Sequence, residues 1–400
     1  MSSIYTGISG MQANQQGVDL IANNIANANT TGYKASRADF ESALANTLFY
    51  GMQGSDPMQV GQGVGLGSME YNLNQGALTQ TGTPLDMAMV GNGYFIVGDG
   101  KNQSYTRAGT FQLDGNQRIV YGNTGLGVMG WTANSDGSIN TNVPPTANLT
   151  IPLGMTYAVP TTKATIGGNL SIAATSPVTN TMSVYDSLGV KHDITLTYTK
   201  SATPGQWTLT ATSADGTVTI PAGQQSLTFD ANGKLTSGPV SMSLTLTNSN
   251  GTAPIAMTAD LSTVTQLAGD TTVQTVSQDG LPMGTLQNCS VGTDGTITGI
   301  FSNGGSRVLG QVAVAHFNNP AGLVQEGNSL WSTSPNSGNA VVETAVKGAD
   351  VIRGGYLEQS NVDLTTEFGN LIVMQRGYQA NSKSITTGDE MLQVVLQLKQ

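Results

Sequence analysis

Charged side chains are scarce in this chain. Of its 400 residues, Asp, Glu, Lys and Arg make up 10%, against about 25% in an ordinary soluble domain. The formal net charge is -10, and the sequence contains no run of Lys or Arg. Because phosphate binding needs clustered basic side chains, the composition argues against a nucleic-acid partner. A surface with so few charges is either covered by neighbouring molecules or hydrated by hydroxyl and amide groups.

Cysteine and histidine are almost absent as well. The single Cys289 excludes an internal disulfide framework and a Cys-based zinc site, and we interpret it as a small buried residue. Neither His192 nor His316 has a carboxylate or Cys partner at motif spacing. Asp and Glu are scattered and form no EF-hand loop or His/carboxylate metal cluster. The sequence therefore predicts no catalytic residue, no metal site and no cofactor, and it argues against an enzyme.

Long hydrophobic runs are missing too. No stretch approaches the roughly 18 to 20 apolar residues that a membrane span requires, so we expect no membrane insertion. The first 17 residues lack the basic and apolar regions of a cleavable signal peptide. We expect a protein that is either cytoplasmic or exported by a route that uses no such peptide.

One glycine motif has the sequence pattern of a dinucleotide-binding site but not its structural context. Gly125–Gly130 matches GxGxxG and follows a strand-like stretch. A dinucleotide site also needs a helix that opens at the last glycine, and Trp131–Ile139 is turn-like. We interpret the motif as turns in a chain that contains 51 glycines.

Two stretches with helical periodicity stand at opposite ends of the chain. In both, apolar side chains recur at alternating intervals of about four and three residues, the spacing of one helix face. The N-terminal ladder consists of Ile4, Ile8, Met11, Val18 and Ile25, and the C-terminal ladder of Leu364, Phe368, Leu371, Tyr378, Ile385, Leu392 and Leu396. The pattern predicts helices over residues 3–27 and 364–398.

The residues between the ladders are rich in Gly, Thr, Ser and Asn and follow the period of two that is typical of strands. Asp114-Gly115 indicates a hairpin within residues 105–120. From about residue 150 to 283, strands and turns recur at roughly ten-residue spacing, which is typical of a sandwich or barrel. Gln311–Phe317 is apolar on both faces, which predicts a central strand.

Residues 33–75 give mixed signals. Arg37–Tyr50 could form a short helix, and a glycine-rich stretch follows it. We interpret the whole segment as an extended connection whose shape depends on its neighbours.

The predicted fold is mixed and mainly β. It has discontinuous, nested β domains of sandwich or barrel type, and paired N- and C-terminal helices that form a coiled-coil-like domain. The expected parts are a terminal helical polymerisation domain (1–27 with 364–400), an extended connecting segment (28–75), an inner β domain (76–148 with 284–363) and an inserted outer β domain (149–283).

The terminal helices allow two interpretations: they pair within one molecule, or they join several. Two features favour contacts between chains. A second apolar stripe of Met391, Val395 and Leu398 cannot be covered by the same partner as the ladder. The second helix also contains Gly369, Gly377 and Gly388, and each costs about 1 kcal/mol relative to Ala. Such a helix would gain order from assembly.

Long motifs occupy both ends of the chain and the first β segment. They include Asn24–Lys34, Thr81–Asp86, Gly91–Phe95, Tyr105–Phe111, Glu358–Leu364 and Gln375–Asn381. In sequence and order they resemble the signatures of the bacterial flagellar rod and hook proteins, the axial proteins of the flagellum. The motif residues singled out are Asn24, Asn27, Thr30, Gly32, Tyr33, Gln375, Arg376, Tyr378 and Asn381.

The resemblance favours the hook members of this family. Val184–Gly189 is similar to a segment of their outer domain, and shorter rod relatives lack an insert like 149–283. It implies a flexible helical tube, a universal joint that transmits motor torque to the filament and encloses the export channel. The implied partners are further copies of the chain, the distal rod, hook cap and hook–filament junction proteins, and the type III export apparatus. The implied location is the hook, outside the cell, after export without a cleaved signal peptide.

Two other interpretations stay open. A distal-rod or junction protein of the same family would need no large outer insert. A secreted β-rich adhesin or carbohydrate-binding module would need a ligand site within 149–283, where the aromatic platforms are limited to Tyr185, Tyr198 and Trp207.

For the hook, the hypothesis is that the N-terminal ladder packs against the C-terminal ladder from Leu371 onward, within and between subunits. Burial at about 25 cal/mol per Å² would then supply much of the assembly energy. The low-charge β surfaces would slide past one another as the tube bends.

Overall fold

The chain divides into two compact units. A computed structural model describes residues 2–43, 46–49, 58–61, 63–100, 102–122, 124–146, 149–246, 252–345 and 350–397. Unit 1 comprises Met1–Ile151, Cys289–Thr298 and Val308–Gln400, and unit 2 comprises Pro152–Asn288 and Gly299–Arg307. Three strands cross the division, namely β23 (Leu281–Val291), β24 (Thr296–Phe301) and β25 (Ser306–His316).

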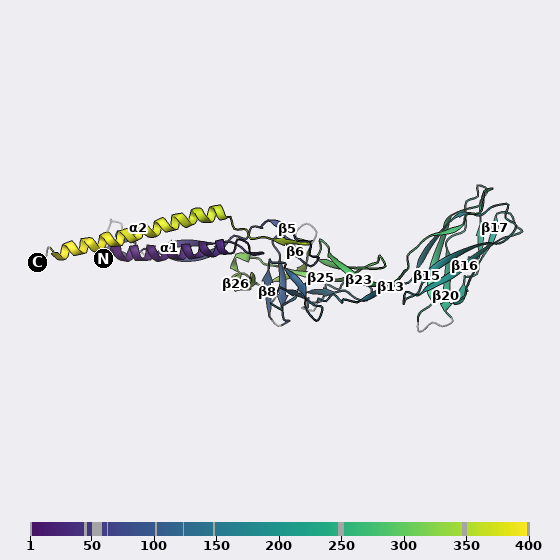
Figure 1. Cartoon of the computed structure of the whole chain (residues 1–400), viewed down its shortest axis with the longest axis horizontal. Coiled ribbons are helices and arrows are strands. Elements are labelled where there is room, and N and C mark those ends of the chain that lie inside the picture. Colours follow the sequence, from purple (N-terminus) through teal and green to yellow (C-terminus); the bar gives the residue numbers. More distant parts are fainter. Residues whose placement is uncertain are drawn as a thin grey trace. The chain divides into compact units, whose positions relative to one another are not determined.

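Unit 1 contains both helices, α1 (Ser2–Ala26) and α2 (Leu364–Gln397). They lie side by side and antiparallel, with the two chain ends at the same end of the pair (Figure 1). Asp363 caps α2, since its carboxylate accepts hydrogen bonds from Thr365 N at 2.9 Å and Thr366 Oγ1 at 2.8 Å. Both helices start and end within one residue of the positions that the ladders predict.

The turn after α1 depends on one glycine. Gly32 has a φ of +67°, and a Cβ atom there would lie 2.5 Å from the backbone N of Ala108. Its own N–H donates to the carbonyl of Glu358 at 2.8 Å. Only glycine combines this left-handed backbone with such a close approach.

A two-stranded ribbon of β1 (Ser36–Ser42) and β4 (Val64–Tyr71) follows and lies against α1. Val64 N donates to Ser9 Oγ at 3.3 Å, and the Phe40 ring reaches to 3.4 Å from the Cβ position of Gly17. A short helix from Arg37 is therefore wrong, because this stretch pairs as a strand. Tyr50 lies outside the described residues. A second ribbon joins β2 (Asn46–Phe49) and β3 (Met58–Val60).

The sheets of unit 1 gather around β25. Val312, Ala313, Val314 and Ala315 are all fully buried. β25 pairs with β7 (Tyr94–Gly98), β12 (Gly130–Thr132) and β28 (Val341–Thr344), so the predicted central strand is confirmed. The hairpin at Asp114-Gly115 is confirmed, since β9 (Phe111–Leu113) pairs antiparallel with β10 (Ile119–Tyr121). The remaining elements of unit 1 are β5 (Leu78–Gln80), β6 (Met87–Val90), β8 (Gln103–Thr106), β11 (Gly127–Val128), η1 (Pro320–Gly322), β26 (Val324–Gly327), β27 (Leu330–Ser332), β29 (Val351–Gly354) and β30 (Tyr356–Glu358).

Segments from the two halves of the chain pair directly in unit 1. β29 pairs with β6, and β30 pairs with β5, all antiparallel. The residues just before α2 are therefore held by strands that follow α1 in sequence, which brings the bases of both helices to one place.

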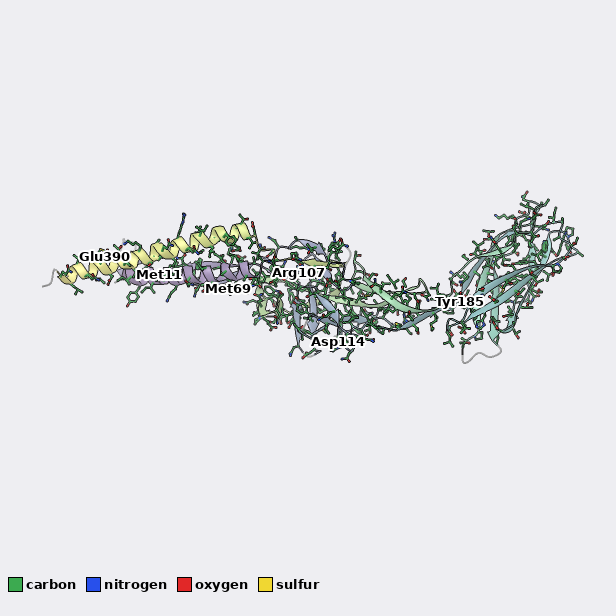
Figure 2. All side chains as sticks on the ribbon, in the orientation of Figure 1. Met11, Met69, Arg107, Asp114, Tyr185 and Glu390 are labelled. Carbon is green, nitrogen blue, oxygen red and sulfur yellow. The ribbon has the colours of Figure 1, made fainter. Side chains whose placement is uncertain are left out.

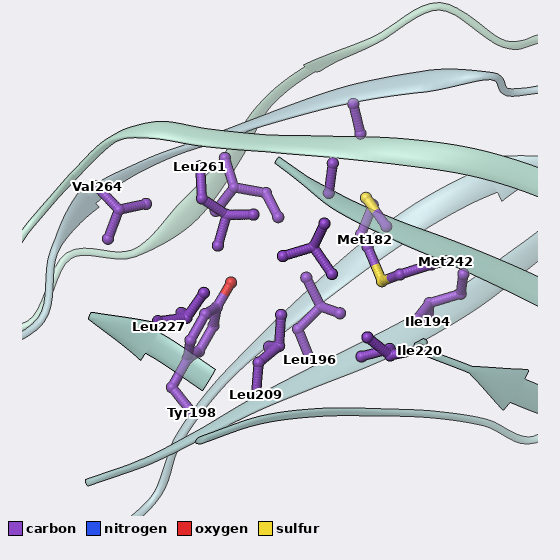
Figure 3. Close-up of a cluster of buried hydrophobic side chains, with 14 of the residues drawn as sticks. Met182, Ile194, Leu196, Tyr198, Leu209, Ile220, Leu227, Met242, Leu261 and Val264 are labelled. Carbon is purple, nitrogen blue, oxygen red and sulfur yellow. The ribbon is translucent and has the colours of Figure 1, made fainter. Parts of the chain in front are cut away.

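Unit 2 is a sandwich of two sheets, with strand orders β18-β20-β21-β14-β22 and β15-β16-β17-β19. Buried side chains alternate with exposed ones along β16 and β21, and both sheets contribute to one apolar cluster (Figure 3). The strands are β13 (Thr156–Val159, paired with β23), β14 (Lys163–Asn169), β15 (Val178–Tyr185), β16 (Lys191–Lys200), β17 (Gln206–Ser213), β18 (Gly216–Thr219), β19 (Ser226–Thr228), β20 (Val240–Leu246), β21 (Ile255–Thr265) and β22 (Gln274–Gln278).

The core of unit 2 can be tested at one strand. Trp207 of β17 is fully buried in this cluster, whereas Thr208 faces solvent from the same strand. Trp207→Ala should lower the free energy of unfolding of unit 2 by about 3–5 kcal/mol, because a large cavity replaces the indole. Thr208→Ala should change it by less than about 0.5 kcal/mol. Hydrogen exchange of the β16 and β17 amides in the full chain measures both, and equal effects would contradict the sandwich core.

Candidate functional site: the terminal helix pair

The two helices touch through glycine and asparagine. A Cβ atom on Gly10 would lie 2.7 Å from Asn381 Nδ2, and one on Gly377 would lie 2.7 Å from Asn14 Oδ1. Asn14 Nδ2 also donates to the Gly10 carbonyl at 2.6 Å. The glycines that approach the partner helix are Gly7, Gly10, Gly17, Gly377 and Gly388. The missing side chains let the two backbones come close together.

The ladders lie beside this contact line and leave much apolar surface exposed. In the N-terminal ladder Ile8 is 37% exposed, while Ile4, Met11, Val18 and Ile25 are half-buried. In the C-terminal ladder only Leu371 and Ile385 are half-buried. The exposed members are Leu364 (44%), Phe368 (51%), Tyr378 (39%), Leu392 (41%) and Leu396 (67%). The role of these ladder residues in a subunit interface stays a prediction.

Contact between the ladders within one subunit is limited. Ile385 lies over Gly7, and Ile4 lies over Gly388, so each touches the glycine line of the other helix. In the second apolar stripe Met391 is 61% exposed. The side chain of Val395 and all of Leu398 lie outside the described residues.

Asn24 joins three segments at the base of the helix pair. It is 1% exposed, and its Nδ2 donates to the Ser36 carbonyl at 2.8 Å and to Glu367 Oε1 of α2 at 3.0 Å. Its Oδ1 accepts from Ser36 N at 3.0 Å and from Tyr33 OH at 3.1 Å. A single amide thus ties α1 to β1 and to α2, and no aliphatic side chain could replace it.

A buried ionic cluster forms around Glu358. Lys34 Nζ donates to Glu358 Oε1 at 2.6 Å, and Arg107 Nη1 lies 3.7 Å from Glu358 Oε2. All three residues are at most 2% exposed, and Arg107 lies where the helices meet the sheets (Figure 2). Gly76 N also donates to Glu358 Oε1 at 2.9 Å. This carboxylate therefore holds together segments from four places in the sequence.

The remaining motif residues divide between the turn and the surface. Thr30 Oγ1 donates to Asn27 Oδ1 at 3.0 Å, which closes the turn after α1. Asn381 is half-buried beside Gly10. Gln375 and Arg376 are exposed on α2. The motifs therefore combine residues that hold the subunit together with residues that its own fold leaves free.

Two groups of the site have shifted pKa values. Burial lowers the pKa of Lys34, and Glu358 opposes the shift. Burial raises the pKa of Glu367, the hydrogen bond from Asn24 opposes this, and Asp363 adds to it. In both groups, the charged form is therefore less stable at the folded base of the helix pair than in the unfolded chain.

Both histidines have carboxylate neighbours in the fold, which the search for partners at motif spacing did not reveal. His192 Nδ1 lies 2.9 Å from Asp215 Oδ2, and His316 Nε2 lies 2.7 Å from Asp350 Oδ2. Asp215 and Asp350 lie 23 and 34 residues away in sequence, so local spacing could not reveal them. Asp186, six residues before His192, lies 3.6 Å from its Nε2. Among the described residues no group of three His, Cys, Asp or Glu is placed to hold a metal ion.

The glycine motif Gly125–Gly130 lies in two short strands and the residues beside them. Gly127–Val128 and Gly130–Thr132 are strands, and a strand and a turn follow, so the prediction that no helix opens there is confirmed. Over the described part of the chain, neither helix has the combination of length and hydropathy that a membrane span requires.

Three family models match the chain. They are "Flagella basal body rod protein" over residues 4–34, "Flagellar basal body protein FlaE D2 domain" over 153–281 and "Flagellar basal body rod FlgEFG protein C-terminal" over 353–398. The first and last cover most of α1, the turn and α2, and the second covers most of unit 2.

Curated relatives match from end to end. The flagellar hook protein FlgE of Borreliella burgdorferi is 34% identical over 453 residues, with 100% of both chains covered. The chain belongs to the flagellar hook protein family. FlgE of Escherichia coli is 32% identical over 416 residues, with 98% of each chain covered. The crystal structure of Helicobacter pylori flagellar hook protein FlgE2 aligns with 70% of this hook-family chain and 100% of its own at a TM-score of 0.49 and 16% identity.

Hook-family proteins are structural and not enzymes, and they polymerise into the hook of the flagellum. This agrees with a site made of helix surfaces. Sequence reasoning missed the glycine contact line and the Lys34–Glu358–Arg107 cluster. The spacing of Gly7, Gly10 and Gly17 was a usable signal for the first, and nothing local indicated the second.

Substitution of Glu358 tests the buried cluster in the hook-family subunit. Glu358→Gln leaves the charges of Lys34 and Arg107 buried without their carboxylate, so it should lower the free energy of unfolding of unit 1 by about 3–5 kcal/mol. Glu70→Gln is the matched control, since the Arg37–Glu70 pair is also 2.6 Å long but lies on the surface. It should cost at most about 1 kcal/mol. Urea unfolding followed by circular dichroism compares them, and similar costs would contradict a structural role for the cluster.

The raised pKa of Glu367 predicts a pH effect. The unfolded chain releases this proton near pH 4.5, and the folded chain releases it at higher pH. The free energy of unfolding therefore falls as pH rises through that window and then levels off. Glu367→Gln keeps an acceptor for Asn24 and lacks this ionisation, so its stability relative to the unmodified chain should increase from about pH 4 to pH 7. Urea unfolding at each pH measures the difference, and a difference that stays constant from about pH 4 to pH 7 would contradict this account.

Proposed function

We propose that this chain is the structural subunit of the flagellar hook and that copies polymerise through their terminal helices into a flexible helical tube. One observation carries the proposal. The subunit satisfies its own helix contact with glycine and asparagine and leaves the larger ladder side chains exposed. Such a helix pair folds within one subunit and still exposes apolar surface that another copy can cover.

The exposed ladder residues would supply the assembly free energy. Complete burial of one Leu, Ile or Phe side chain contributes about 1.5–3 kcal/mol. Ile8, Phe368, Leu392 and Leu396 each keep more than a third of their surface exposed in the subunit. Several such side chains, buried at every subunit contact of a polymer, would offset the entropy lost on association.

In this proposal, 1–27 with 364–400 is the polymerisation domain, 28–75 connects it, 76–148 with 284–363 is the inner β domain and 149–283 is the inserted outer domain. The terminal helices line the inner tube around the export channel. The polar, sparsely charged β surfaces exchange contacts at little cost as the tube bends. The tube then acts as a universal joint that transmits motor torque to the filament.

The further partners follow from the same family assignment. They are the distal rod below the hook, the hook cap during growth, the hook–filament junction proteins above it, and the type III export apparatus. The chain would reach its place outside the cell by that apparatus, without a cleaved signal peptide. End-to-end similarity to hook proteins supports the hook over the distal rod.

A ladder variant tests the proposal. The triple substitution Ile8→Asp, Phe368→Asp and Leu396→Asp places charges on surfaces that the subunit leaves exposed, so the subunit should fold and stay monomeric in sedimentation. The matched control is Ile172→Asp, Val276→Asp and Met283→Asp in unit 2, whose side chains are 47%, 63% and 61% exposed. It should still form tubes visible by electron microscopy. Normal tubes from the ladder variant would rule out helix-mediated polymerisation.

A further inference from the structure

We propose that neighbouring copies meet head to tail through the outer faces of their helices, with Asp19 of one copy facing the basic pair Arg376 and Lys383 of the next. The proposal rests on the proposed function, since it names the surfaces and the charge pairing of the helix-mediated contact. The occupant of each face is a second copy of this chain.

α1 carries a single charge on one defined side. Asp19 is the only charged residue among its 25, and it is exposed. It follows Gly17, which contacts Met374 of α2, by two residues. Two residues turn an α-helix by about 200°, so Asp19 faces away from α2. Its carboxylate accepts one hydrogen bond, from Gln15 Nε2 at 3.0 Å, and its remaining lone pairs face solvent.

α2 carries the complementary charges on the side that faces away from α1. Arg376 and Lys383 each follow a contact residue, Met374 and Asn381, by two positions, so they also face away from α1. Both are exposed, and within the described part of the chain neither forms an ion pair. They are seven residues apart, about 10.5 Å along one side of the helix.

Apolar side chains accompany the charges on both outer faces. Phe368 and Ile372, about two turns and one turn before Arg376, are 51% and 52% exposed. Tyr5, two heptads before Asp19, is 70% exposed. Each outer face therefore offers apolar area to bury and a charge that fixes orientation, a combination typical of specific interfaces.

The signs of these charges decide between self-pairing and head-to-tail pairing. Two α1 faces would bring two Asp19 carboxylates together, whereas an α1 face against an α2 face pairs opposite signs. A contact between two different surfaces can repeat from copy to copy, and it builds an open helical filament when the rotation between copies does not close a ring. The competing arrangement is an antiparallel pair of α2 faces, in which Lys383 would meet Glu390, the exposed residue seven positions further on.

Charge reversal in the full-length chain tests the pairing. Asp19→Lys should raise the critical concentration for polymerisation, measured by pelleting, on the order of tenfold near 0.1 M salt, and the effect should shrink near 1 M salt because screening weakens exposed charge pairs. Asp19→Lys combined with Lys383→Asp or with Arg376→Asp should return it to within about twofold, and the swap that does so identifies the partner. Circular dichroism of the dilute monomer checks that the helices persist.

Glu390→Lys is the matched control, since it makes the same change in net charge on an exposed helical residue. It should leave the critical concentration within about twofold. The proposal is overturned if neither swap restores polymerisation, or if Glu390→Lys acts as strongly as Asp19→Lys, which would support pairing of α2 faces. If Asp19→Lys polymerises normally while the ladder variant is monomeric, the charge pairing fails and the proposed function stands. Normal tubes from the ladder variant would remove both.

Discussion

The close contact between the terminal helices constrains the rest of this molecule. Glycines normally weaken a helix, and each costs about 1 kcal/mol relative to Ala. Here Gly7, Gly10, Gly377 and Gly388 lie where the two backbones approach each other, with Asn14 and Asn381 filling the space between them. A helix pair packed in this way uses few of its large ladder side chains, such as Ile4 and Ile385, for its own contact. The same residues that weaken each helix therefore leave much of the ladders exposed in the subunit.

The base of the helix pair has a different physical character. Lys34, Arg107 and Glu358 are buried charges, and removal of one partner from such a set is costly because the others stay buried without compensation. The amide of Asn24 adds directional hydrogen bonds to Ser36 and Glu367. Apolar contacts tolerate sliding, whereas this set of bonds is satisfied in one arrangement. The helices are thus joined to the sheets of unit 1 by interactions that resist twisting, which suits a subunit that transmits torque.

Local patterns were enough to predict part of this structure. The ladders predicted both helices, the apolar run at Gln311–Phe317 predicted the central strand, and Asp114-Gly115 predicted a hairpin, because each signal lies within one element. The strand at Ser36–Ser42 was not predicted, since its partner starts 22 residues after it ends and α1 supports its face. Glu358 lies 324 residues from Lys34, and the histidines meet aspartates of other segments. Such contacts depend on the fold as a whole, and periodicity gives no information about them.

The ion pair between Lys34 and Glu358 also constrains the order in which the parts of the chain fold. The two residues come from nearly opposite ends of the chain, and α2 lies entirely within its last 37 residues. The chain loses conformational entropy when it closes a loop of this length, before the contacts between the two residues add any stabilisation. This part of the molecule is therefore slow to fold. A chain that emerges with its N-terminus first can fold unit 2 early, but α1 must wait for the last residues to arrive. The helix surface that we propose as the subunit contact therefore forms last, after the rest of the chain is available to fold.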